Sequence, residues 1–145
     1  MKPPNPAALA FLAEEEAIAR LTPFADMLNI AVTARSMPAS PASVWAVTCY
    51  ATPRHPTDTY GFRAMVQVMA RLAPPPGMAP ESWLTYRGMV PISIDMALTG
   101  PARDECPARV QYAHRTSFAI LESSLDGTET ASYNYELHLT PKRGQ

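Results

Sequence analysis

Residues 130–140 decide the fold of this chain, and they read Thr130-Ala131-Ser132-Tyr133-Asn134-Tyr135-Glu136-Leu137-His138-Leu139-Thr140. Every second residue, from Ala131 to Leu139, is apolar, and the residues between them are all polar. A period of two is the side-chain period of a β-strand, in which successive side chains point to opposite faces. The stretch therefore predicts a strand with one face on a hydrophobic core and the other on water or on a polar partner.

A second run with a period of two precedes this strand, and the residues of its more apolar parity are Val110, Tyr112, Thr116, Phe118 and Ile120. Asp126-Gly127 lies between the two runs, and Asp-Gly is the strongest short signal for a β-hairpin. We therefore expect residues 108–140 to form an antiparallel hairpin that closes the chain.

The N-terminal part of the chain predicts a helix over residues 7–21. Asn5 suits the N-cap and Pro6 suits the first helical position. The apolar residues on one side are Ala8, Phe11, Leu12, Ile18 and Leu21. The run Glu14-Glu15-Glu16 marks the side that faces water, and Thr22-Pro23 is expected to end the helix.

The middle of the chain predicts further strands. Residues 24–35 indicate a turn and a short strand, and residues 43–52, apolar on both faces, indicate a central strand. Residues 60–72 fit a strand or a helix equally well. Residues 89–98 alternate and predict a strand, whereas residues 80–84 favour at most the opening of a short helix. The expected class is α+β: a mostly antiparallel sheet of about five strands, an N-terminal amphipathic helix and one or two further short helices.

The composition bounds the architecture and the partners. The 145 residues suit one domain, 1–145, with an extended lead at 1–4 and a polar tail at 141–145. Charged residues are 17%, below the usual quarter, so part of the surface is expected to contact a partner. The net charge of −1 provides no basic field for nucleic acid. No apolar run is long enough to span a membrane, and no signal peptide is evident, which favours the cytoplasm or a particle assembled there.

The chain has no catalytic motif, and we expect no enzyme activity, cofactor or metal. His55, His114 and His138 occur singly, without the spacing of a zinc site. A general base could come from an acidic residue, but loop acids are usually solvated. The acidic residues considered are Asp58, Asp95, Asp104 and Glu105. Cys49 and Cys106 are expected to be two buried free thiols rather than a disulfide.

The order of elements resembles the tail terminator, or minor capsid and tail-completion, proteins of long-tailed bacteriophages. In that family an amphipathic helix is followed by strands and loops, then by a helix and a final set of antiparallel strands. The matching pieces here are the helix at 7–21, the proline-bearing loop 37–41 before the strand at 44–50, the loop 53–59, the segment 62–72 and the run 100–118. One departure is the proline-rich segment 74–83, which leaves little room for the helix after the third strand.

The resemblance implies a structural virion protein, assembled in the host cytoplasm. Its subunits would form a ring, expected to be six-fold, that caps the tail tube at the neck and joins it to the head. The implied partners are other copies of the chain, the tail tube and the head–tail connector proteins, with DNA only passing through the lumen. The loop around residues 53–60 would face the lumen or the next ring, and the polar face of the last strand would contact a neighbour. The implied interface residues are Arg54, His55, Asp58, Tyr60, Ser132, Asn134 and Glu136.

Two other functions are open on the residues alone. The first is a small α+β enzyme or ligand-binding domain of a thioesterase-like kind, with an apolar pocket and a polar group such as Asp95 or His114. The second is an adaptor domain that binds another protein.

Overall fold

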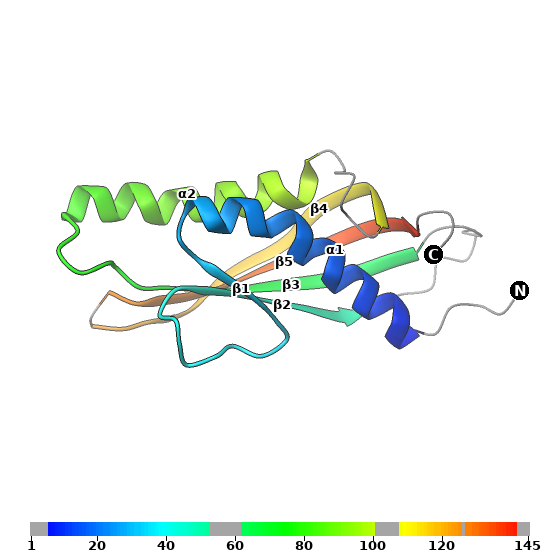
Figure 1. The fold of residues 1–145 in the computed structure, drawn as a ribbon, viewed down its shortest axis with the longest axis horizontal. Helices are drawn as coiled ribbons and strands as arrows, with labels where there is room; N and C mark the ends of the chain where they lie inside the picture. Colours follow the sequence, from blue (N-terminus) through cyan, green and yellow to red (C-terminus); the bar gives the residue numbers. More distant parts are fainter. Residues whose placement is uncertain (1–5, 53–61, 101–107, 126, 142–145) are drawn as a thin grey trace, which may run out of the picture.

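The computed structural model describes residues 6–52, 62–100, 108–125 and 127–141. In this part of the chain, two helices pack on one face of a five-stranded sheet (Figure 1). The elements in chain order are α1 (Pro6–Met27), β1 (Ala31–Ala34), β2 (Val44–Ala51), β3 (Phe62–Leu72), α2 (Pro80–Thr99), β4 (Ala108–Ser123) and β5 (Glu129–Pro141). The sheet order is β1-β2-β3-β5-β4, with β1 and β2 parallel and the other pairs antiparallel. The predicted α+β class is confirmed.

The central pair of strands is β3 and β5, whose pairing runs without a slip from Phe62 opposite Leu139 to Leu72 opposite Glu129. Alternate residues of β3 are buried along its whole length, so residues 62–72 form a strand and the helical alternative is excluded. The apolar positions of β5 are buried as the sequence predicts. Because the two strands are in register, their apolar residues form one continuous face.

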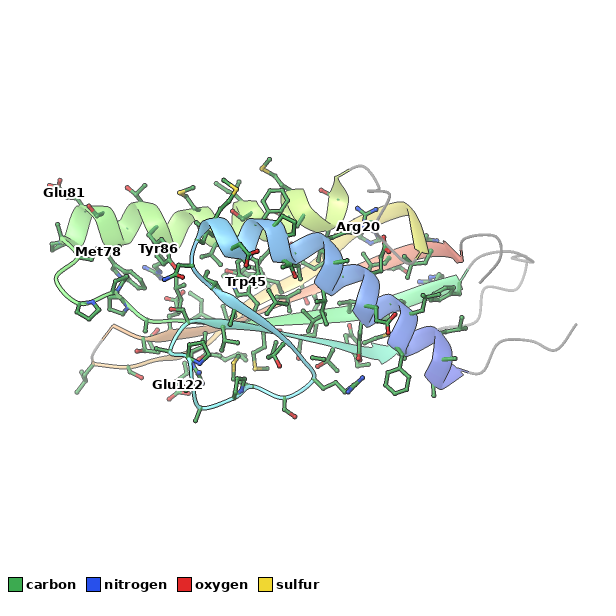
Figure 2. The ribbon with its side chains drawn as sticks, in the orientation of Figure 1. Arg20, Trp45, Met78, Glu81, Tyr86 and Glu122 are labelled. Carbon is green, nitrogen blue, oxygen red and sulfur yellow. The ribbon has the colours of Figure 1, made fainter. Side chains whose placement is uncertain are left out.

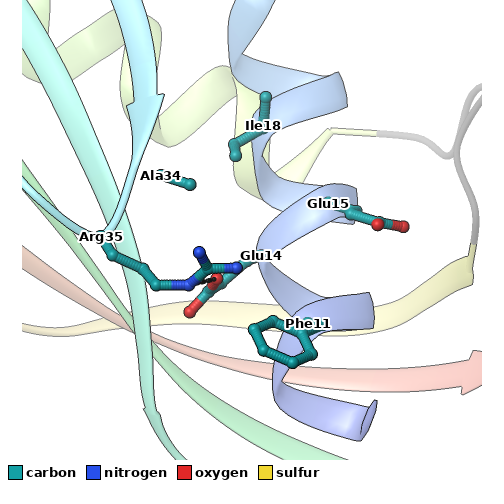
Figure 3. Close-up of a pocket in the computed structure, with 6 residues that line it drawn as sticks. All are labelled: Phe11, Glu14, Glu15, Ile18, Ala34 and Arg35. Atoms are coloured by element: carbon teal, nitrogen blue, oxygen red, sulfur yellow. Dashed lines mark hydrogen bonds and ion pairs between the residues drawn. The ribbon is translucent and has the colours of Figure 1, made fainter. Parts of the chain in front are cut away.

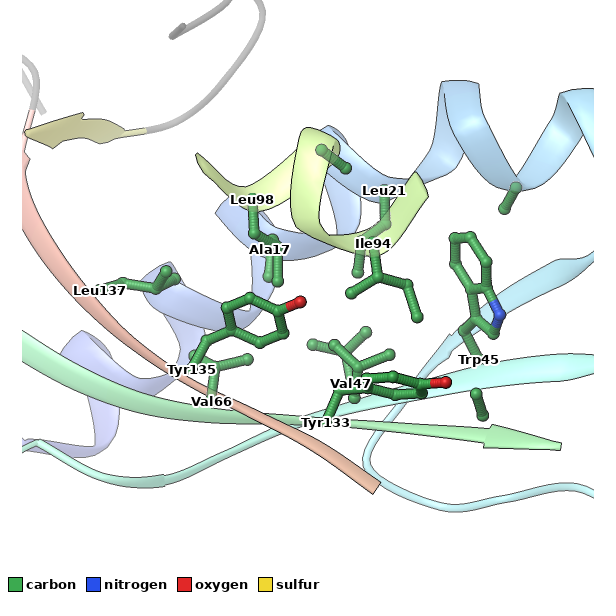
Figure 4. Packing of buried hydrophobic residues seen from close by; sticks show 14 of the residues in the cluster. Ala17, Leu21, Trp45, Val47, Val66, Ile94, Leu98, Tyr133, Tyr135 and Leu137 are labelled. Atoms are coloured by element: carbon green, nitrogen blue, oxygen red, sulfur yellow. The ribbon is translucent and has the colours of Figure 1, made fainter. Parts of the chain in front are cut away.

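The hydrophobic core lies between this face and the helices (Figure 4). Trp45 and Val66 from the sheet and Leu21 and Ile94 from the helices are fully buried. Burying one such side chain contributes about 1.5–3 kcal/mol to stability. Cys49 is also buried and is a free thiol, as predicted, whereas Cys106 lies outside the described residues.

Neither helix covers the other face of the sheet (Figure 1). We call this surface the helix-free face. On its two central strands, it consists of Arg63, Met65, Gln67, Met69 and Arg71 of β3 with Thr130, Ser132, Asn134, Glu136 and His138 of β5.

The predicted strand at residues 89–98 is wrong, because this segment belongs to α2. The helix begins with Pro80 in its first turn, where a proline is well accommodated, and it continues for 20 residues. Its buried residues are Val90, Ser93, Ile94, Ala97 and Leu98. These have helical spacing, so the segment could satisfy the core as a helix although it also alternates. A full helix therefore follows β3, despite the prolines at 74–76.

The predicted end of α1 at Thr22-Pro23 is also wrong, because the helix continues to Met27 with Pro23 inside it. Proline lacks the N–H that would bond to the carbonyl one turn earlier. Nearby, the Thr22 hydroxyl donates to the Ile18 carbonyl at 2.7 Å. Asn29 then adopts a left-handed conformation, with φ of 57°, and the chain turns into β1.

The closing hairpin forms as predicted, but the single parity predicted for its first strand does not hold. Pairing of β4 with β5 shifts register between Val110 and Tyr112, between Arg115 and Ser117, and between Ile120 and Glu122. Val110 pairs with Leu139 and Tyr112 with His138, which belong to opposite faces of β5. The shifts fit an edge strand, where β-bulges are frequent.

Candidate interaction surfaces

Four of the predicted interface residues, Arg54, His55, Asp58 and Tyr60, lie in the segment 53–61, outside the described residues. The other three, Ser132, Asn134 and Glu136, lie together on the helix-free face of β5. The structure therefore shows the positions of the three β5 residues only.

Uncharged side chains link three strands across this face. The Gln67 amide donates to Ser132 Oγ at 3.0 Å and to Asn134 Oδ1 at 3.4 Å. The Asn134 amide donates to Ser117 Oγ at 3.0 Å. Ser132 is only 4% exposed. The centre of the helix-free face is thus a satisfied hydrogen-bond network that needs no further partner.

A charged cluster centres on Glu136, at the end of the face nearer the C-terminal end of β5. Arg63 Nε donates to Glu136 Oε1 at 2.6 Å. His114 Nε2 lies 3.3 Å from Glu136 Oε2, and His138 Nε2 lies 4.0 Å from Glu136 Oε1. Within the described ranges, no group of three His, Cys, Asp or Glu residues is placed to hold a metal ion.

On the helix-free face, the stripe of β3 residues combines charge with apolar surface. It reads Arg63, Met65, Gln67, Met69, Arg71, and each of these residues is half-buried. Arg71 donates to the carbonyls of Pro41 and Ala42 at 2.7 and 2.8 Å, and it forms no ion pair with a described carboxylate. The stripe therefore offers two flexible thioether side chains between two arginines.

The outer side of α2 is apolar, and the alternating pattern of residues 89–98 does not predict it. Leu84, Met89, Ile92 and Met96 are 45–61% exposed, and we call these four residues the α2 ridge. Leu84, Ile92 and Met96 fall on one i, i+4 row with Gly88 between them. Glu81, in the first turn, is exposed and forms no ion pair with a described side chain (Figure 2). In a strand, Ile92 and Met96 would share one face with the buried Ile94. The strand prediction therefore does not predict an exposed ridge. The opening Pro80 and the helical spacing of the buried residues were the signals that could have found it.

The two residues named for an enzyme, Asp95 and His114, are not brought together. Asp95 lies on the helix side of the sheet, where the Tyr135 hydroxyl donates to it and Arg115 Nη1 lies 3.4 Å from its Oδ2. His114 pairs with Glu136 on the helix-free face. Burial raises the pKa of the Tyr135 hydroxyl, and the bond to Asp95 raises it further.

A shallow depression lies beside α1, lined by Phe11, Glu14, Glu15, Ile18, Ala34 and Arg35 (Figure 3). Glu14 Oε1 accepts from Arg35 Nε at 3.0 Å, and Glu14 Oε2 accepts the Cys49 backbone N–H at 2.9 Å. The Arg35 guanidinium also lies 4.7 Å from the centre of the Phe11 ring. The polar groups here already bind one another, so we interpret the depression as a structural contact between α1, β1 and β2 and not as a ligand site.

The glutamate run of α1 was predicted to face water, and this is wrong for two of its three residues. Glu14 is 4% exposed and Glu16 is fully buried, whereas Glu15 is exposed. Successive helical residues lie about 100° apart, so three in a row cannot share one side. Glu16 Oε1 accepts from Arg20 Nε at 2.9 Å, and Arg20 Nη1 donates to the Gly100 carbonyl at 2.8 Å. This buried pair ties α1 to the end of α2.

No protein-family model matches the chain, and no curated protein matches it. A chain from the virion of a native gene transfer agent particle has a similar structure, with a TM-score of 0.52. The match covers 92% of this chain and 96% of that chain, at 12% sequence identity. At this identity the likeness establishes the fold alone. In the described part of the chain, no helix is long and apolar enough to cross a membrane.

Proposed function

We propose that this chain is a structural protein of a phage-like virion, which forms a ring that terminates the tail tube and joins it to the head. The observation that carries the proposal is the fold, which matches a virion chain over nearly the whole length of both. The element order, with a helix after the third strand, is also the order expected of tail terminator proteins. The role requires no catalysis and no cofactor.

The distribution of surfaces supports assembly. A closed ring with rotational symmetry needs two different contact patches on each subunit. The α2 ridge lies on the outer side of the helix layer, and the helix-free face lies on the opposite side of the molecule (Figure 2). A subunit with two such faces can bind one neighbour with each.

The first test is assembly of the purified chain. We expect rings in negative-stain electron microscopy and a single high-mass species in native mass spectrometry, with six copies as the expected number. Added to tail tubes, the rings should be found at one end. A chain that stays monomeric even with tail tubes present would contradict the proposal.

The second test is the double substitution Thr130→Lys and Asn134→Lys, at two half-buried positions of β5 on the helix-free face. Two lysines on the helix-free face would place charge in the predicted subunit contact, so the ring should be lost while circular dichroism still shows a folded chain. The control is Ser124→Lys in the hairpin turn, which should assemble normally. A double variant that is folded and still forms rings would exclude this face from the contact.

A further inference from the structure

We infer that the α2 ridge of one copy docks on the helix-free face of the next copy. The inference rests on the proposed assembly for its second copy and adds which two surfaces meet.

The apolar surfaces match in kind. The α2 ridge exposes Met89, Ile92 and Met96, and the stripe of β3 offers Met65 and Met69. Methionine side chains adapt to irregular surfaces, so thioethers on both sides can interdigitate. Within one copy, the helices already cover the inner face of the central strands β2, β3 and β5. Docking would cover the second face of the sheet with a helix too, the arrangement of a three-layer fold.

The charges match at the end of the contact. Glu81 opens α2, and Arg71 ends the stripe of β3; neither pairs with a described side chain of opposite charge. Along α2, Met89 and Ile92 lie about 12 and 17 Å from Glu81. Along β3, Met69 and Met65 lie about 7 and 20 Å from Arg71. With Glu81 beside Arg71 of the next copy, Met89 and Ile92 of the ridge fall between the two methionines of the stripe.

Two other contacts, ridge against ridge and helix-free face against helix-free face, fit the charges less well. Two α2 ridges face to face would leave both Glu81 carboxylates without a basic partner on the ridge. Two helix-free faces in contact would bring Arg63 and Arg71 of both copies together. The nearby carboxylates would not offset this charge, because Glu136 already binds Arg63 and Glu122 lies two strands away from Arg71. Because the two surfaces lie on opposite sides of the molecule, each docking event leaves one of each kind free. The contact therefore repeats from copy to copy.

The decisive experiment mixes two variants, each of which lacks one of the two contact surfaces. Ile92→Lys disables the ridge and leaves the helix-free face intact, and Met69→Lys does the reverse. We expect each variant alone to be a folded monomer, and the mixture to form one-to-one pairs and nothing larger, in native mass spectrometry. Leu125→Lys, at the fully exposed hairpin tip, is the matched apolar-to-lysine control and should form the same ring as the unmodified chain.

Charge reversal tests the pairing with substitutions at exposed or half-exposed sites. Glu81→Arg alone and Arg71→Glu alone should each weaken assembly at least tenfold in concentration, and the two together in one chain should restore it. If the unmodified chain forms rings but the mixed variants stay monomeric, or the double reversal rescues nothing, the inference is wrong and the proposed ring stands. If the unmodified chain never assembles, the proposed function fails first.

Discussion

Glu14 carries two hydrogen bonds that join three elements. One carboxylate oxygen binds Arg35, which directly follows β1, and the other binds the backbone of Cys49 in β2. Cys49 lies at a register shift of the pairing between β2 and β3. At such a shift a backbone N–H can lose its strand partner, and the buried carboxylate supplies one instead.

Replacing Glu14 tests this role at the residue scale. Glu14→Ala leaves the Cys49 N–H buried without its acceptor, so the free energy of unfolding should fall by about 1–3 kcal/mol. Urea denaturation measures the change. The neighbouring Glu15→Ala is the control and should stay within about 0.5 kcal/mol, because Glu15 is exposed. Equal effects at the two positions would show that Glu14 is not a structural acceptor.

At the scale of the element, the apolar residues of α2 lie on two sides of the helix, one buried and one exposed. Val90, Ile94 and Leu98 enter the core, and Ile92 and Met96 remain on the outside. The same residues would all have shared one face of a strand. Helix formation therefore creates the exposed ridge and fills the core in one step.

The two isoleucines of α2 provide a matched pair for measurement. Ile94→Ala removes a fully buried side chain and should lower the free energy of unfolding by about 2–5 kcal/mol. Ile92→Ala removes a side chain that is 60% exposed, so the monomer should lose less than about 1 kcal/mol. Thermal unfolding at low concentration compares them. Similar losses at both positions would argue against the helix.

At the scale of the whole molecule, tyrosine hydroxyls join elements that are distant in the sequence. Tyr135 of β5 donates to Asp95 of α2, and Tyr86 of α2 donates to the Leu28 carbonyl at 2.7 Å. Burial raises the pKa of Tyr86, Tyr133 and Tyr135 above the ordinary tyrosine value. The folded protein therefore holds these protons more tightly than the unfolded chain does.

This proton linkage predicts alkaline instability. A raised pKa in the folded state gives stability that is complete below the unfolded pKa, about 10, and is lost as the pH rises above it. The free energy of unfolding should thus fall as the pH rises above about 10. Tyr135→Phe should make the fall smaller, and Tyr50→Phe, at an exposed position, should not change it. An unchanged fall in Tyr135→Phe would rule out this tyrosine as a source.

The sequence predicts the parts of this molecule in which one pattern dominates. The alternation in β5 places its buried and polar faces correctly, including Ser132, Asn134 and Glu136. In α2, alternation and helical spacing coexist, and the choice depends on contacts with α1 and the sheet that no local pattern contains. The register shifts of β4 and the buried pair of Glu16 with Arg20 likewise arise from partners distant in the chain. The order of the strands, with β5 between β3 and β4, is a global property of the same kind.

The register shifts of β4 also determine where this fold tolerates changes in length. β4 has 16 residues and β5 has 13, and three shifts absorb the difference. An inserted or deleted residue in β4 can enlarge, move or remove a bulge at the edge of the sheet, so its effect stays local. In β3 the same change would turn every residue beyond it to the opposite face, because its pairing with β5 has no slip. Relatives of this chain that differ in length should therefore differ in β4 and agree in β3.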